Sequence, residues 1–334
     1  MNATGRPGGS PPADVLAQVR AAMRRAEIDA LVLRPSPDFR FLGGGGEDFL
    51  VLTHDEVRET QDPRGCVPEG ARRVGVDAEM RVRELFGLGI DAELVPASAV
   101  LSPLRLRKRP DEIEALARAA ASAQAVLRQA REMIWFGASE RTMAASLRVL
   151  MVESGCEEVL DLRVAAGEHT ALPAHRPTGR VINPGDAVQV AVCGRWDGYC
   201  AEVARVFAVA EPPEDFEAMY SVVHSAHASA MAAVRPAVPV AGLAATVAGV
   251  IDSSGYGRFA GAHCGRGVGR GHDEPPRVSE ADDAVLADGM ALCLEPAIYV
   301  PELFGARLAD VVVCAPGGAL ALSTPPATVH VLDR

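Results

Sequence analysis

The spacing of apolar residues over the first hundred positions predicts a small α/β domain. Residues 14–28 carry apolar side chains at helical spacing, and short apolar runs further along are typical of buried strands. The predicted elements are helices at 14–28 and 78–88 and strands at 29–34, 49–53 and 73–77. Because helices and strands alternate, we expect one compact α/β domain over residues 13–106. Residues 1–12, rich in glycine and proline, predict a disordered tail.

Residues 107–334 predict a second, larger domain. Pro110 suits the first turn of a long helix, and the acidic residues Asp111 and Glu112 favour the positive end of its dipole. Ser139 is a typical N-cap for another helix, which Gly155 ends. Further along, β-rich stretches at 181–192, at 203–210 and from 290 onward alternate with helices near 214–234 and 241–253. This mixture predicts an α+β domain.

Composition and charge argue against several classes of partner. The formal net charge is −11, from 33 basic and 44 acidic residues, and basic residues do not cluster with aromatic ones, so we expect no nucleic-acid partner. No run approaches the roughly 18 apolar residues of a membrane span, so we expect no membrane contact. The N-terminus lacks the apolar region of a signal peptide. The seven cysteines form no CxxC pair, which predicts free thiols and a cytoplasmic location.

Six short motifs follow one another in a characteristic order. They are the junction Leu104-Arg-Leu-Arg-Lys-Arg-Pro-Asp-Glu-Ile-Glu114, then Arg180-Val-Ile-Asn-Pro-Gly-Asp186, Trp196-Asp-Gly-Tyr199, Gly265-x-Gly-x-Gly269, Glu274-Pro-Pro276 and Gly289-Met-x-x-x-x-Glu295-Pro296. With these motifs the sequence resembles the creatinase and X-Pro peptidase (prolidase, aminopeptidase P) family over nearly its whole length. The resemblance implies a creatinase-like N-terminal domain at 13–106, followed by a pita-bread catalytic domain at 107–334.

The chain departs from the family at the positions where the metallopeptidases bind two metal ions. The resemblance places Ala191, Glu202, Arg266, Glu295 and Ala309 where those enzymes have two Asp, one His and two Glu. Arginine cannot lose its proton. A fixed cation 4 Å from a metal ion costs about 4 kcal/mol per unit charge at an effective dielectric constant near 20. We therefore expect no metal and no cofactor.

Metal-free members of the family, creatinase and ectoine hydrolase, suggest a function. We expect a metal-independent enzyme that acts on a C–N bond of a small polar nitrogen compound, by hydrolysis or elimination. The predicted catalytic residues are His175, a proton carrier with an ordinary pKa near neutrality, and the carboxylates Glu202 and Glu295. The predicted substrate-binding residues are Arg266, Asp273, His272, Tyr199 and Arg307.

Several alternatives stay open. His175 could point away from the cavity, and Glu202, Glu295 and Arg266 could form a buried ion cluster that only fills space. The chain could then be an inert pita-bread scaffold with a binding role, and a third alternative is an X-Pro aminopeptidase with unusual ligands. The expected partners are a small-molecule substrate and a second copy of the chain, because the resemblance implies a homodimer.

Overall fold

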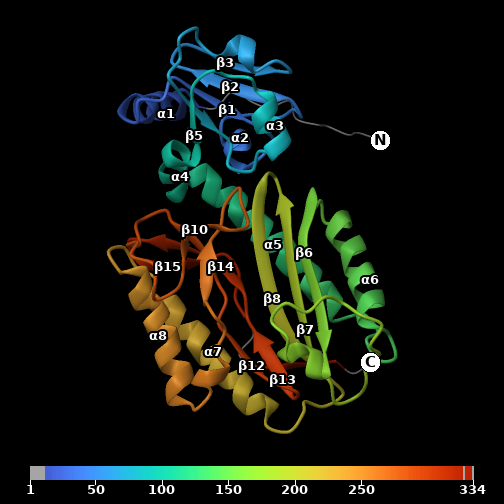
Figure 1. Cartoon of the computed structure of the whole chain (residues 1–334). Coiled ribbons are helices and arrows are strands. Elements are labelled where there is room, and N and C mark those ends of the chain that lie inside the picture. Colours follow the sequence, from blue (N-terminus) through green and yellow to red (C-terminus); the bar gives the residue numbers. More distant parts are fainter. Residues whose placement is uncertain (1–11, 326–327, 333–334) are drawn as a thin grey trace. The chain divides into compact units, whose positions relative to one another are not determined.

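The computed structural model describes residues 12–325 and 328–332. The chain divides into two compact units, Met1–Leu106 and Arg107–Arg334, which Figure 1 colours from blue to red along the sequence. The predicted disordered tail lies outside the described residues, apart from Pro12. Each unit has its own hydrophobic core.

The first unit is built on a five-stranded mixed sheet, in the order β3-β2-β1-β4-β5. Its strands are β1 (Ala30–Leu33), β2 (Phe49–Thr53), β3 (Val57–Thr60), β4 (Arg73–Val76) and β5 (Glu93–Pro96). Its helices are α1 (Ala13–Arg25), α2 (Pro37–Phe41), α3 (Val82–Gly87) and α4 (Ser98–Leu106), with a 3₁₀ turn η1 (Arg64–Cys66). Alternation along β1 sends Leu31 and Leu33 into one core and Ala30 and Val32 into another, so both faces of the sheet are covered.

The second unit contains two larger sheets and a two-stranded ladder. The first sheet has the order β16-β8-β7-β6, the second has the order β10-β9-β11-β14-β15, and β12 pairs with β13. The strands of the first sheet are β6 (Glu158–Ala166), β7 (Ala187–Trp196), β8 (Tyr199–Val209) and β16 (His330–Leu332). The other strands are β9 (Gly265–Gly267), β10 (Glu274–Arg277), β11 (Ala291–Leu294), β12 (Ala297–Val300), β13 (Phe304–Arg307), β14 (Asp310–Ala315) and β15 (Gly318–Ala321).

In the described part of the second unit, four helices cover these sheets. They are α5 (Pro110–Ala130), α6 (Glu140–Glu153), α7 (Phe216–Ala233) and α8 (Val240–Ser253), with 3₁₀ turns η2 (Gly167–Ala171) and η3 (Gly257–Phe259). In Figure 1, α6 lies beside β6, while α7 and α8 run together on the side of the second sheet. The predicted N-cap is confirmed, because the Ser139 side chain accepts a hydrogen bond from the Thr142 amide at 3.1 Å.

A tight hairpin fixes the register of the longest strands. Asp197 and Gly198 connect β7 to β8, and both have positive φ, 50° and 74°. Two such residues are typical of the type I′ turn, whose twist matches that of the flanking strands. The pairing that follows sets Cys193 opposite Glu202. The α+β class predicted from the sequence is confirmed.

Most of the cysteines are buried. All seven are free thiols; Cys66, in the first unit, is half-buried, and the other six are buried in the second unit. No described helix is long and apolar enough to cross a membrane.

Candidate functional site

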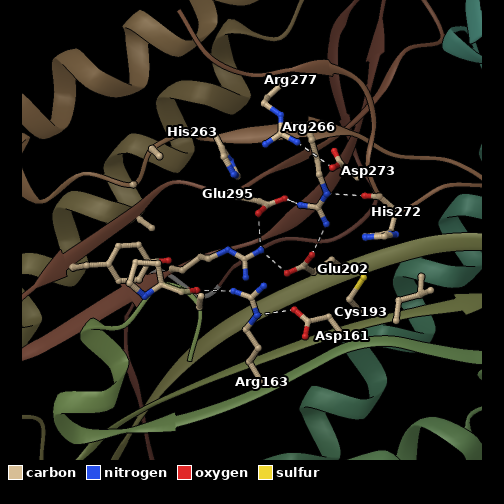
Figure 2. A pocket seen from close by; sticks show the side chains of 18 residues that line it. Asp161, Arg163, Cys193, Glu202, His263, Arg266, His272, Asp273, Arg277 and Glu295 are labelled. Atoms are coloured by element: carbon tan, nitrogen blue, oxygen red, sulfur yellow. Dashed lines mark hydrogen bonds and ion pairs between the residues drawn. The ribbon is translucent and has the colours of Figure 1, made fainter. Parts of the chain in front are cut away.

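A strongly charged cavity of about 500 Å³ lies in the second unit. Its charged lining residues are Arg163, Arg266, Arg277, Arg307, Asp161, Asp273, Glu202 and Glu295. Figure 2 shows most of these side chains directed toward one another around the cavity. Four arginines therefore face four carboxylates, so the cavity combines high charge density with no net charge. We call it the charged cavity.

Backbone pairing brings the innermost residues together from distant parts of the chain. Glu202 lies on β8 and Arg266 on β9. Glu295 directly follows β11, and Arg307 is the last residue of β13. The β9–β11 register sets Cys293 opposite Arg266, so a thiol lies beside the ionic groups.

The four inner side chains form a closed ion cluster. Arg266 donates from Nη2 to Glu202 Oε2 at 2.5 Å, and its Nη1 contacts Glu295. Arg307 Nη2 donates to Glu295 Oε2 at 2.5 Å and also to Glu202. Each guanidinium thus contacts both carboxylates, and Figure 2 shows Arg266 beside Glu202 and Glu295. Arg266 Nε also donates to the carbonyl of His272, at 2.6 Å.

Electrostatics keep this cluster ionised. Burial by itself raises the pKa of Glu202, but the neighbouring Arg307 and Arg266 outweigh burial and lower that pKa to about 2. Burial works against the charge of Arg266, yet Glu202 and its other neighbours raise the pKa of the guanidinium above its usual range. Burial raises the pKa of Cys293 to about 12, so this thiol stays protonated at neutral pH.

Six of the predicted site residues line the charged cavity. They are Glu202, Glu295, Arg266, Arg307, His272 and Asp273. Asp273 is also paired with Arg277, at 3.0 Å between Oδ2 and Nη2. The structure therefore gathers most of the predicted residues in one place.

Tyr199 lies outside the lining of this cavity. Its hydroxyl donates to Glu112 Oε1 at 2.8 Å, and the guanidinium of Arg270 lies 4.6 Å from the centre of its ring. Tyr199 and Glu202 are three residues apart on one strand, so their side chains point to opposite faces. The substrate-binding assignment of Tyr199 is not supported by this position.

His175 is not in the charged cavity either. The residue before it, Ala174, lines that cavity, whereas His175 lines a neighbouring one. Its Nε2 lies 2.9 Å from Glu140 Oε2. Because His175 is one residue beyond Ala174, its side chain points away from the charged cavity. His175 therefore does not lie beside Glu202 and Glu295 as expected.

Several residues of the cavity were not predicted from the sequence. Asp161 and Arg163 come from β6, a strand that was not predicted, and they pair with each other at 2.6 Å. Their spacing of two residues, which puts them on one face of a strand, was the available signal. His263 and Tyr299 also line the cavity, and their positions depend on tertiary packing.

A second ionic cluster surrounds Glu140, the first residue of α6. This carboxylate is fully buried and accepts hydrogen bonds from the amides of Ala166 and Thr178, both at 2.9 Å, and from the Thr178 hydroxyl at 2.7 Å. His169 Nδ1 lies 2.9 Å from Oε1. Burial raises the pKa of Glu140, but the hydrogen bonds with Thr178, His175 and His169 outweigh burial and hold that pKa below its usual value, so the group is anionic.

Two groups of described residues bring three metal-ligating atoms within 4.8 Å of one another, namely Glu202, Cys293 and Glu295, and Glu140, His169 and His175. In the first group, guanidinium ions contact both carboxylates. Ala191 and Ala309 lie in the apolar core. The first group therefore does not fit the two-ion centre implied by the family resemblance. The second group offers two imidazoles and one carboxylate, a set that fits a single zinc-like ion.

Comparisons with known proteins place these observations in context. The model of Metallopeptidase family M24 matches residues 114–316. The uncharacterized peptidase YqhT of Bacillus subtilis is 32% identical over 243 residues, covering 72% of this chain and 69% of that protein. The Xaa-Pro dipeptidase of Pyrococcus horikoshii is 29% identical over 330 residues, covering 90% and 94%. The crystal structure of dipeptidase PepE from Mycobacterium ulcerans matches with a TM-score of 0.87 at 27% identity, covering 98% and 100%.

These findings correct the function predicted from the sequence. A metal-independent enzyme that acts on small nitrogen compounds, as creatinase does, is the wrong interpretation, because the relatives are named peptidases and dipeptidases. The structure also contains one residue group, Glu140, His169 and His175, whose ligand types fit a metal ion. The prediction relied on individual ligand positions and did not consider Glu140, His169 and His175 together.

Proposed function

Because this chain belongs to metallopeptidase family M24, we propose that it acts on short peptides, as a dipeptidase. The observation that carries the proposal is the charged cavity, where four arginines face four carboxylates in about 500 Å³. Ligand sites for small molecules have volumes of roughly 300–1,000 Å³. A dipeptide has one ammonium, one carboxylate and one amide, and such a zwitterion matches a cavity with both charges and no net charge.

The outer ion pairs recognise the charged ends of the peptide. Arg163 pairs with Asp161, and Arg277 pairs with Asp273, and all four side chains are between 31% and 52% exposed. Exposed pairs contribute only about 0–1 kcal/mol, so a charged ligand can replace either partner at little cost. The arginines then bind the carboxylate of the peptide, and the aspartates bind its ammonium.

Arg307 holds the peptide carbonyl. Its side chain is buried, and Nη1 has no hydrogen-bond partner among the described residues. A buried donor without a partner costs about 1–3 kcal/mol, which a bound carbonyl oxygen would recover. Because Nη2 is held by Glu202 and Glu295, the guanidinium has a fixed orientation, and Nη1 donates to and polarises the carbonyl.

Glu140, His169 and His175 are the residues that would hold a single divalent ion. Such an ion, when bound, supplies a Lewis acid and lowers the pKa of a bound water. His175 also lines the neighbouring cavity, which shares Asp161 and Arg163 with the charged cavity.

The test is peptide cleavage followed by chromatography and mass spectrometry. Purified protein is incubated with Gly-Leu, Leu-Gly and Leu-Pro, with EDTA or with added Zn²⁺ or Mn²⁺, and free amino acids are counted. We expect cleavage of at least one peptide, and roughly tenfold lower kcat/KM when Arg163→Met removes one recognition group. Arg118→Met is the matched control, because Arg118 forms an exposed pair with Asp197 outside the cavity. Absence of both cleavage and binding under every condition would refute the proposal.

Two further predictions belong with this function. We expect a homodimer, which light scattering at micromolar concentration would detect and a strict monomer would contradict. A cytoplasmic location also stays a prediction, and fractionation of cells that make the protein would test it.

A further inference from the structure

An apolar pocket of about 350 Å³ lies beside the charged cavity. One wall is the α8 helix, which contributes Ala244, Val247, Ala248 and Ile251. Other lining residues include Val278 and Pro296. Ser279 and Glu280 add polar groups, but apolar side chains make up most of this lining, whereas arginines and carboxylates dominate that of the charged cavity.

The two spaces share part of their lining. Gly261, Ala262, His263 and Ala297 line both the apolar pocket and the charged cavity. Three of these four residues have no side chain beyond Cβ. A Cβ added at Gly261 would lie 3.5 Å from Ala297 Cβ and 3.8 Å from Tyr299 Cε2, which is ordinary contact. The main chain of these residues, in which the Gly261 amide donates to the Ala297 carbonyl at 3.0 Å, therefore lies between the polar space and the apolar one, with only small side chains beside it.

His263 adds a polar group at this boundary. Its Nδ1 is buried and has no hydrogen-bond partner among the residues that the structure describes. Burial lowers the pKa of His263, and the nearby Arg277, Arg266 and Arg307 lower it further, so the imidazole is neutral at pH 7. A buried neutral nitrogen that lacks a partner favours a ligand with a polar group at this point.

We propose that the apolar pocket receives the apolar side chain of a peptide whose charged ends occupy the charged cavity. The substrate class is then a dipeptide with one large aliphatic or aromatic residue, and His263 hydrogen-bonds to its backbone. This inference rests on the proposed function and adds the specificity of the same site. Burying a leucine-sized side chain corresponds to about ten- to a hundredfold tighter binding.

Ala248 provides a direct way to fill the pocket. Ala248→Leu adds three carbons to the α8 wall, and Ala248 does not line the charged cavity. Gly249→Leu is the matched control, because Gly249 is the next residue of α8 and is exposed. Circular dichroism and the urea midpoint show whether each variant is folded.

The experiment compares three probes, Gly-Gly, Gly-Leu and Leu-Gly, by isothermal titration calorimetry, or by kcat/KM for those that are cleaved. We expect wild type to prefer one of the leucine peptides by about ten- to a hundredfold over Gly-Gly. Ala248→Leu should remove this preference without changing the value for Gly-Gly, and Gly249→Leu should retain it.

Different failures have different meanings. Equal values for all three peptides in wild type would overturn the apolar-pocket inference and leave the proposed dipeptidase function standing. The same holds if Ala248→Leu keeps the preference, or weakens Gly-Gly as much as the leucine peptides. If no probe is bound or cleaved, the proposed function and this inference both fall.

Discussion

Removing Arg266 should expose how strongly the inner ion cluster depends on its cations. Arg266→Met keeps most of the length of the side chain and deletes the guanidinium that contacts Glu202 and Glu295. Among the described residues, Arg307 then remains as the one guanidinium in contact with both carboxylates, so two buried negative charges would share one cation. The variant therefore tests charge balance more than packing.

The size of the effect follows from the pKa of Glu202. Arg307 and Arg266 overcome burial and lower this pKa from 4.5 to about 2, a difference of about 3 kcal/mol at 1.36 kcal/mol per unit. Because the pKa is lower in the folded state, this stabilisation is present above about pH 4.5 and is lost as the pH falls through about 2. Breaking one partner of a buried pair costs about 3–5 kcal/mol. We expect Arg266→Met to lose about 3 kcal/mol at pH 7.

Tryptophan fluorescence during urea unfolding measures this loss of stability in the second unit, which contains the ion cluster. The only two tryptophans of the chain, Trp135 and Trp196, both belong to the second unit. The free energies of unfolding of wild type and variant are compared at intervals from pH 7 to pH 3. The difference should shrink on acidification, because protonated glutamates no longer need the missing cation.

Arg118→Met is again the control, since an exposed pair contributes about 0–1 kcal/mol. A loss below 1 kcal/mol for Arg266→Met at pH 7 would refute the reasoning. A larger loss that stays constant between pH 7 and pH 3 would show that packing, not charge, is responsible.

Three further changes probe the other groups. Glu140→Gln should lower the free energy of unfolding by about 2 kcal/mol in urea titrations, because the buried carboxylate is an acceptor for several donors; an unchanged value would contradict its central role. Arg266→His should bind Zn²⁺ or Mn²⁺ at least about tenfold more tightly than wild type in calorimetry, since an imidazole replaces a cation beside Glu202 and Glu295; equal affinity would show that the guanidinium does not compete with the ion. Arg307→Lys keeps the charge and removes Nη1, so kcat/KM for a cleaved dipeptide should fall about ten- to a hundredfold, and full activity would exclude the carbonyl contact.

The sequence could predict that residues lie in the same site where strand pairing fixes their positions. Glu202, Arg266 and Glu295 follow motifs whose spacing is fixed by hairpins and ladders, and the structure brings them into contact. Tyr199 could have been placed on the opposite face of β8 by counting, because three residues separate it from Glu202.

Other features could not be predicted because they depend on packing between distant segments. Glu140 begins a helix, His169 lies in a 3₁₀ turn and His175 lies in the loop beyond. Only the fold brings the two imidazoles within hydrogen-bond distance of the Glu140 carboxylate. The apolar pocket likewise needs α8 to lie against the segment around Gly261. Apolar residues on a helix predict burial, but not which space they leave open.

The distribution of cysteines gives the protein a built-in chemical label. In the folded chain Cys66 is half-buried, whereas the other six cysteines are buried in the second unit. A maleimide reagent should therefore attach to one position of the native protein and to all seven of the unfolded protein. The mass of the labelled chain then counts unfolded molecules directly, and a single fluorophore on Cys66 reports on the first unit without any engineered residue.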